Sequence, residues 1–140
     1  MAAVLGVNAT KLVATTGDNI IDVGYNKAVS KTMFDTYTAA ALAAGSTITM
    51  CDKLPVGAVI FNIRMINAAL GASSTISIGD AASAARYLAA TSTASAAVVN
   101  MSVQSGFGYK ITGTNDTQII LTTAGAAITG LVVLQIEYSI

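Results

Sequence analysis

Residues 131–140 read LVVLQIEYSI, and apolar and polar residues alternate along most of this stretch. Successive side chains of a β-strand point to opposite faces, so this alternation predicts a strand with one buried face. The inward face is expected to carry Val132, Leu134, Ile136, Tyr138 and Ile140. The outward face is expected to carry Gln135, Glu137 and Ser139.

Similar strand-like runs recur along the chain and are separated by turns rich in Gly, Asn and Asp. This spacing is typical of all-β domains, and it predicts an antiparallel β-sandwich or jelly-roll-like domain of about eight strands over residues 32–140. In the run near residue 60, the odd-numbered residues Val59, Phe61, Ile63 and Met65 are expected to face inward. The predicted strands are Met33–Leu42, Thr47–Cys51, Ala58–Ile66, Thr75–Ile78, Val98–Val103, Gly108–Thr112, Gln118–Thr123 and Thr129–Ile140.

The alanine-rich segment 80–98 does not follow the strand pattern. Alanine has the highest helix propensity, and Asp80 is a residue type that often caps a helix N-terminus. A short helix from Asp80 to about Leu88 is therefore one expectation, and an alanine-rich loop is the alternative.

Residues 1–31 contain scattered Gly, Asn and Asp and show no sustained periodicity. They are interpreted as an extended N-terminal arm without a core of its own. A terminal strand or two at the edge of the domain is the alternative interpretation.

The charge content of the chain is low. Among 140 residues, seven are Lys or Arg and seven are Asp or Glu, giving a net charge of +0. Nucleic-acid binding usually requires a cluster of basic residues, and here they are dispersed, so no nucleic acid is expected as a partner. A surface with so few charges is unusual for a free monomer and favours contact with other protein.

The apolar content does not indicate a membrane protein. The chain is 54% hydrophobic with a mean hydropathy of +0.67. A membrane-spanning helix needs about 18 or more consecutive apolar residues, and the stretch Ala124–Leu134 is shorter and interrupted by Gly125, Thr129 and Gly130. The first residues lack a secretory leader and Cys51 is the one cysteine, so folding in a reducing cytoplasm is expected.

The residue types that carry most enzyme chemistry are absent or isolated. Without His there is no imidazole base or ligand, and a single Cys cannot hold zinc. Cys51 is interpreted as a buried small hydrophobic residue. The carboxylates are spread singly, and Asp80 and Asp116 are assigned to turns, where Asp commonly accepts backbone hydrogen bonds. No catalytic, cofactor-binding or metal-binding residue is predicted.

Two stretches carry a family resemblance. Phe34-DTYTAAALAAGSTITMCDKLPVGAVI-Phe61 combines a D-x-Y-T strand, a run of small residues and L-P-x-G-A-x-I. Leu70-GASSTISIGDAASAARY-Leu88 is a short strand ending in Gly-Asp and followed by Arg-Tyr-Leu. Both stretches resemble small virion structural proteins of tailed bacteriophages, of the capsid decoration or cement type.

This resemblance implies a non-enzymatic protein that folds in the host bacterial cytoplasm and binds and stabilises an assembled capsid. The implied partners are the major capsid protein and neighbouring copies of the chain. The expected partner-interface residues are the apolar residues of the arm, Val4, Leu5, Val7, Leu12, Val13, Ile20, Ile21 and Tyr25.

Two other roles stay open. One is a head-fibre, tail or baseplate component of the virion, although long repeats and heptads are absent from the sequence. The other is an adhesin-like glycan-binding sandwich, for which Tyr25 near Asp22 and Asn26 is the only local cluster of suitable residues.

Overall fold

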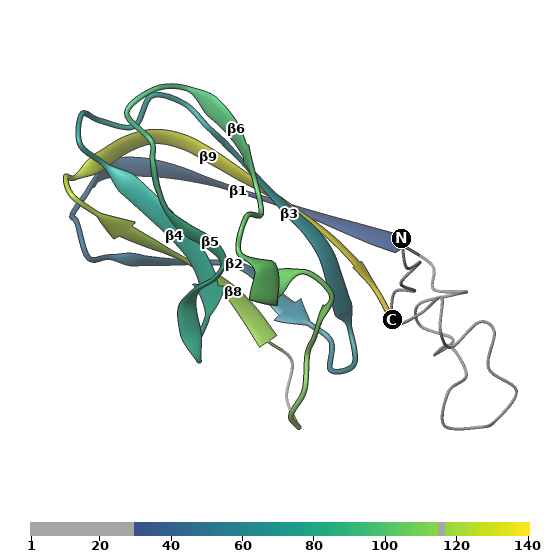
Figure 1. Ribbon diagram of the computed structural model, residues 1–140. Helices are drawn as coiled ribbons and strands as arrows, with labels where there is room; N and C mark the ends of the chain where they lie inside the picture. The colour runs from purple at the N-terminus through teal and green to yellow at the C-terminus, as the bar shows by residue number, and fades with distance from the viewer. Residues whose placement is uncertain (1–29, 115–116) are drawn as a thin grey trace, which may run out of the picture.

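The strands of the protein form two antiparallel sheets that face each other, as the computed structural model shows for residues 30–114 and 117–140 (Figure 1). The first sheet contains β1 (Ser30–Leu42), β9 (Ile128–Ser139), β3 (Val59–Asn67) and β6 (Ala97–Asn100), with the two-residue β7 (Tyr109–Lys110) also paired to β3. The second sheet contains β2 (Thr47–Leu54), β8 (Thr117–Ala124), β4 (Thr75–Asp80) and β5 (Ser83–Ser92). A single 3-10 turn, η2 (Gln104–Gly106), is the only helical element in the described residues. The predicted all-β fold with two antiparallel sheets is confirmed.

The strand order is that of a jelly roll. β1 lies beside β9, β2 beside β8, β3 beside β6 and β4 beside β5, so early strands pair with late ones and only the middle pair is consecutive. A long antiparallel hairpin rolled onto itself gives this order, which is one of the two architectures that the sequence predicted.

The core lies between the two sheets and consists of their inward side chains. Fully buried residues come from the first sheet and from the second in comparable numbers, and Tyr87 is the largest of them. The sequence prediction for the last strand is confirmed at Val132, Leu134, Ile136 and Tyr138, which are buried. It is wrong at Ile140, which is exposed because β9 ends at Ser139, and at Ser139 itself, which was expected to face outward and is buried.

A β-bulge changes the prediction for β3. Ile60 pairs with Tyr138 and Asn62 with Glu137, so Phe61 is an extra residue opposite no partner on β9. Phe61 is therefore exposed and Ile60 is buried, contrary to the expected odd-face pattern. Beyond the bulge the odd face is buried as predicted, at Ile63 and Met65.

The alanine-rich segment is mostly strand, so both the helix and the loop expected there are wrong. Asp80 does not cap a helix: its Oδ1 accepts hydrogen bonds from the backbone N–H groups of Ala82 and Ser83 in the turn between β4 and β5. The chain then returns as β5 against β4, with a register shift that lets adjacent Tyr87 and Leu88 both be buried. Strand pairing and the burial of these two side chains outweigh the helix propensity of the alanines.

Candidate interaction surface

The outer face of the first sheet carries large apolar side chains in contact with solvent. Cross-strand partners share a face of a sheet. Their pairing places Thr36, Val133, Ile66 and Val98 in one row across β1, β9, β3 and β6. Leu131 lies in the row on one side of these four and Phe34 in the row on the other. We call Phe34, Ile66, Val98, Leu131 and Val133 the apolar face.

Four of these side chains are well exposed. The exposed fraction is 67% for Phe34, 60% for Val98, 45% for Leu131 and 38% for Ile66, and Val133 is half-buried between its neighbours. Scattered exposed apolar residues are ordinary on protein surfaces, whereas a contiguous group marks a site of contact. The apolar face is such a group.

Polar side chains lie at one end of the apolar face. Arg64 is in the row of Phe34, where its Nε donates a 3.4 Å hydrogen bond to Oδ1 of Asn100. Gln135 lies in the same row, and its amide donates a 3.1 Å bond to Oε1 of Glu137 in the next row. An apolar centre beside a polar border is the common arrangement of a protein–protein interface.

The outer face of the second sheet is different in chemistry. The row across β2, β8 and β4 consists of Thr47, Thr122 and Ser77, and the neighbouring row contains Thr49 and Ile120. Hydroxyl groups of this kind remain hydrated at little cost. The two outer faces of the sandwich are therefore distinct, and the first is the better candidate for contact with protein.

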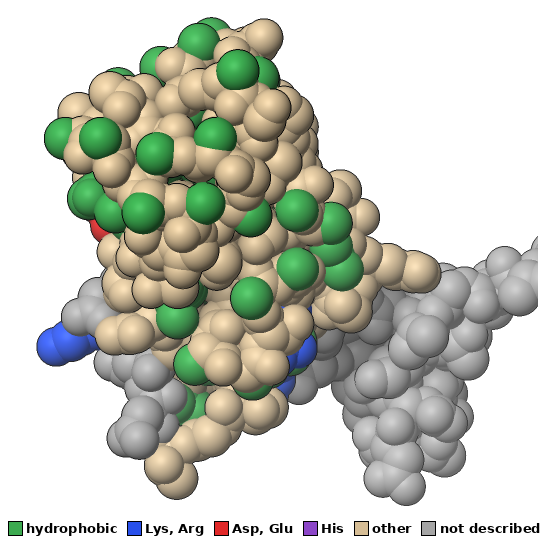
Figure 2. Space-filling model, turned by 90° about the vertical axis from the view of Figure 1, so that its left-hand side faces the viewer, with side chains coloured by type: hydrophobic (Ala, Val, Ile, Leu, Met, Phe, Trp, Pro, Cys, Tyr) green, Lys and Arg blue, Asp and Glu red, His purple; other side chains and the backbone are tan. Residues whose placement is uncertain are grey.

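The loops at one end of the sandwich contain no charged residue. Segments 43–46, 68–74, 93–96 and 125–127 consist of Ala, Gly, Ser, Thr and one Leu, and backbone hydrogen bonds such as Leu70 N–H to Thr93 O tie them together. Figure 2 shows hydrophobic side chains spread over this end, with Lys and Arg below it. These loops therefore form an uncharged surface at this end of the sandwich.

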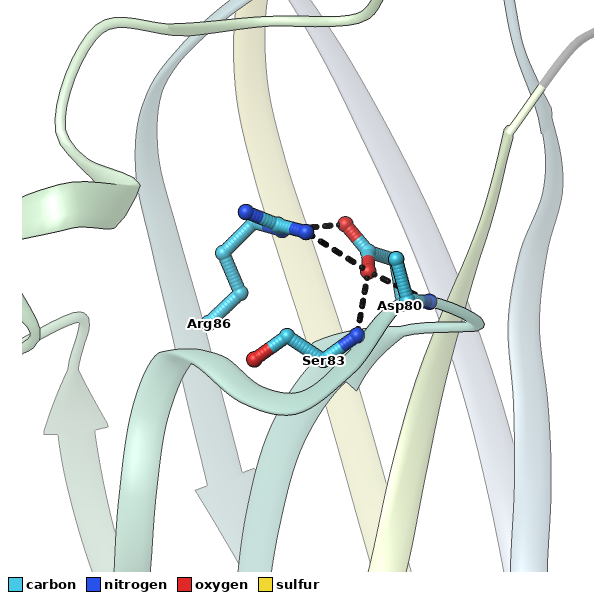
Figure 3. Close-up of polar contacts among 4 residues, drawn as sticks. Asp80, Ser83 and Arg86 are labelled. Atoms are coloured by element: carbon cyan, nitrogen blue, oxygen red, sulfur yellow. Dashed lines mark hydrogen bonds and ion pairs between the residues drawn. The ribbon is translucent and has the colours of Figure 1, made fainter.

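The charged residues Asp80 and Arg86 form an ion pair that organises the β4–β5 turn (Figure 3). The Arg86 guanidinium donates to both carboxylate oxygens of Asp80, with Nε to Oδ2 at 2.5 Å. It also lies over the Tyr109 ring, 4.2 Å from the centroid, which is within the range of a cation–π contact. The hydrogen bond to Asp80 raises the pKa of Arg86 above its ordinary value.

The ring of Tyr87 packs edge-on against that of Tyr109, and burial raises the pKa of Tyr87. The Asp80 carboxylate accepts from two backbone N–H groups and one guanidinium, so these residues hold the β4–β5 turn. The prediction that Asp80 has a structural role in a turn is confirmed.

Cys51 is buried, as predicted, and sits at an irregularity of β2. Its φ of 54 lies in the left-handed region, and its N–H donates a 3.0 Å hydrogen bond to Oδ2 of Asp35 on β1. Burial, and then the charge of Asp35, raise the pKa of the thiol to about 11. Cys51 is therefore a protonated, unreactive thiol at neutral pH.

The interface residues predicted from the sequence, Val4 to Tyr25 of the arm, lie outside the described residues. The apolar face was not predicted. Its signal is the run Leu131-Val-Val-Leu134, in which four consecutive apolar residues make both faces of a strand apolar.

Within residues 30–114 and 117–140, no group of three or more His, Cys, Asp or Glu side chains is placed to hold a metal ion. No helix in the same part of the chain is long and apolar enough to cross a membrane.

Comparison with known proteins gives matches in structure alone. No protein-family model and no curated protein matches the sequence. A chain of the cyanophage Pam1 capsid asymmetric unit is similar with a TM-score of 0.71 at 22% identity, over 100% of this chain and 99% of that chain. A chain of the capsid of Ralstonia phage GP4 is similar with a TM-score of 0.62 at 19% identity, over 79% of this chain and 84% of that chain. This protein therefore shares its fold with proteins of two phage capsids.

Proposed function

We propose that the protein is a non-enzymatic structural protein of a phage virion that binds an assembled capsid and stabilises it, as a decoration or cement protein does. Its location is the capsid surface, and its principal partner is the major capsid protein.

The observation that carries this proposal is the extent of the likeness to the Pam1 capsid chain. The two chains match over 100% of this chain and 99% of the Pam1 chain, so the likeness covers nearly all of both. A shared fold alone is compatible with many functions. A full-length match between two small chains, one of them part of a capsid, favours the same kind of role for both.

The surface chemistry supports the proposal. With seven basic and seven acidic residues, the chain has little charge for binding packaged DNA or for remaining apart from other proteins. The apolar face and the uncharged loops offer contact surface, while the charged pair Asp80–Arg86 is used in folding.

The arm is proposed as the tether to the shell. Residues 1–31 precede or begin β1, an edge strand of the sheet that carries the apolar face. Eight apolar arm residues, named above from Val4 to Tyr25, are proposed to contact the capsid protein. A chain segment of this length in extended form spans up to about 100 Å, more than enough to reach a neighbouring subunit.

The stabilising role is tested on particles with and without the protein. Particles that lack it should break at lower temperature and at lower chelator concentration, and addition of purified protein should restore their resistance. Electron microscopy of the same particles should show added density over the shell. Density only at a fibre, tail or baseplate would refute the decoration role.

A further inference from the structure

We propose that the Asp35 carboxylate prevents another polypeptide from adding a strand at the free edge of β1. This role goes beyond the proposed function, because it concerns the folded chain itself and not its contact with a shell. In the part of the chain that the structure describes, β1 pairs on one side only, with β9, and β2 pairs on one side only, with β8. An edge strand presents unpaired backbone groups, which are a template for pairing with another chain.

Among the edge strands, β1 offers the longest regular template. It has 13 residues, and Ser30 to Ala39 pair with β9 without a register shift. The edge strand β6 has only 4 residues. On β5, the carbonyl oxygen of Tyr87 already accepts hydrogen bonds from the N–H groups of residues 102 and 103. Strand addition is therefore most favourable at β1.

The sequence of β1 provides one obstacle to such pairing. Asp35 is the only charged residue between Thr32 and Leu42, and this segment contains no Pro or Gly. Segments with high β-propensity, little charge and no proline pair readily with other chains. Asp35 lies on the inner face of β1, because its cross-strand partner Leu134 is buried in the core. An inward-pointing charge on an edge strand is one of the features that oppose edge pairing.

The hydrogen-bonding pattern shows which backbone groups of β1 point to the edge. Met101 follows β6, and its N–H donates to the carbonyl oxygen of Ile63, so the backbone groups of Ile63 point away from β9. Along an antiparallel strand, the backbone groups of successive residues point to opposite sides. The registers of β3 with β9 and of β9 with β1 extend this alternation to β1, whose odd-numbered residues bond to β9. The even-numbered residues point to the edge, and they include Thr32, Phe34, Thr36 and Thr38.

The Asp35 carboxylate accepts one edge donor from each sheet. Its Oδ1 accepts a 2.8 Å hydrogen bond from the N–H of Thr36 on β1. Its Oδ2 accepts a 3.0 Å hydrogen bond from the N–H of Cys51 on β2. The N–H of Thr123 donates to the carbonyl oxygen of Ser46, and the same alternation along β2 directs the Cys51 N–H away from β8. We call these two hydrogen bonds the Asp35 bridge, and it joins the free edges of the two sheets.

The Asp35 bridge makes strand addition unfavourable in two ways. An added strand would have to displace Asp35 from the Thr36 N–H. It would also cover a carboxylate for which no cation is available, since the ion pair found in residues 30–114 and 117–140 is that of Asp80 with Arg86. Burial of an unpaired charge is costly, so the edge stays open to water and closed to another strand.

Neutralising the side chain tests this role. Asp35→Asn keeps the size of the side chain but removes its charge, and its NH₂ group cannot accept the second backbone hydrogen bond. The variant should self-associate at about a hundredfold lower protein concentration than wild type, because an added strand no longer buries a charge. Light scattering and sedimentation measure the concentration at which association begins, and thermal melting shows that the variant is folded.

Glu137→Gln is the matched control. It changes the net charge by the same amount, but Glu137 is half-buried on β9, which has a neighbouring strand on both sides. Its association should begin at the same concentration as that of wild type.

A proline at the edge tests where the variant associates. Thr36→Pro removes the freed N–H and spares the bonds to β9, because the backbone groups of Thr36 point away from β9. Combined with Asp35→Asn, it should restore the concentration at which wild type associates. Amide hydrogen exchange tests the bridge in the wild type itself. The Thr36 and Cys51 amides should exchange slowly, and the amide of Thr38, which also points to the edge, should exchange faster.

Three results would overturn the proposal. One is association of Asp35→Asn and Glu137→Gln at the same concentration. Another is association of Asp35→Asn that Thr36→Pro does not reduce, because the contact would then lie elsewhere. The third is exchange at Thr36 and Cys51 as fast as at Thr38, which would show that the Asp35 bridge does not hold in solution. This last measurement decides the matter even if Asp35→Asn does not fold.

Discussion

Asp80 and Arg86 show how a chain with few charges uses a charged pair. The Asp80 carboxylate is buried, and its oxygens accept hydrogen bonds from Ala82, Ser83 and Arg86. Removing a charge costs little at an exposed site, but removing one partner of a buried pair leaves the other unpaired. The stability of the β4–β5 turn should therefore depend on Arg86.

Arg86→Ala should lower the free energy of unfolding by about 2–4 kcal/mol, because it leaves the Asp80 charge in a buried site without its cation. Arg64→Ala is the control, since Arg64 is exposed and bonds Asn100, and it should cost at most about 0.5 kcal/mol. Urea unfolding of both variants measures the difference. Equal losses would show that the Asp80–Arg86 pair does not support the turn.

The Cys51 thiol should affect stability at alkaline pH. Its pKa is about 11 in the folded protein against an ordinary value of 9.0, so the folded state keeps a proton that the unfolded chain loses. The resulting stabilisation is complete below pH 9.0 and is lost as the pH rises through about 11. Stability of the wild type should therefore fall across this range relative to Cys51→Ala, in which the thiol is absent.

Thermal melting from pH 8 to pH 11 measures this difference between wild type and Cys51→Ala. At pH 8 the native thiol should also react slowly with a thiol reagent and quickly once urea unfolds the chain. Rapid reaction of native protein would contradict the burial of Cys51.

At the scale of elements, the sequence predicts a strand where apolar and polar side chains alternate. It fails where the pairing of strands determines which residues form a strand and which side chains are buried. Apolar residues occupy every second position from Val132 to Tyr138, and β9 buries all four of them. Segment 83–92 shows no such alternation, and its alanines have a local preference for helix. It forms a strand because it pairs with β4. The bulge at Phe61 also cannot be predicted from the local sequence, because it is defined by the pairing of β3 with β9.

The close packing of turns gives a prediction at this scale. Gly125 has a φ of +81, and a Cβ there would lie 2.0 Å from the backbone oxygen of Ser73. Gly45 has a similar φ of +84, but a Cβ there would meet nothing within 4 Å. Gly45→Ala should cost about 1–2 kcal/mol from backbone strain alone. Gly125→Ala should cost more than about 4 kcal/mol, because the β3–β4 and β8–β9 loops must separate.

Urea midpoints of the two alanine variants test this pair. Similar midpoints would mean that the loops at this end of the sandwich are not packed as described.

At the scale of the whole molecule, composition and strand spacing predict two apolar-faced sheets in one domain. Composition and strand spacing do not single out the jelly-roll order, because the pairing of β1 with β9 joins residues about a hundred positions apart. The apolar face was not predicted, and the interface predicted in the arm lies outside the described residues. The interface predicted in the arm rests on local composition, whereas the apolar face is assembled from four strands and emerges only when they are side by side.

Deletion of residues 1–20 should separate attachment from folding. As a proposed tether, these residues should contribute less to the melting temperature than to attachment. Binding to shells should weaken strongly if the arm is the tether. A variant that binds like the full chain would remove the arm from the interface.

The most direct test of the account is co-sedimentation of the purified protein with preassembled shells that lack it. The account predicts saturable binding that changes little between low and moderate salt, because an apolar, hydrogen-bonded contact offers few exposed ion pairs for screening. Protein that remains in the supernatant at every concentration, with shells intact, would contradict it.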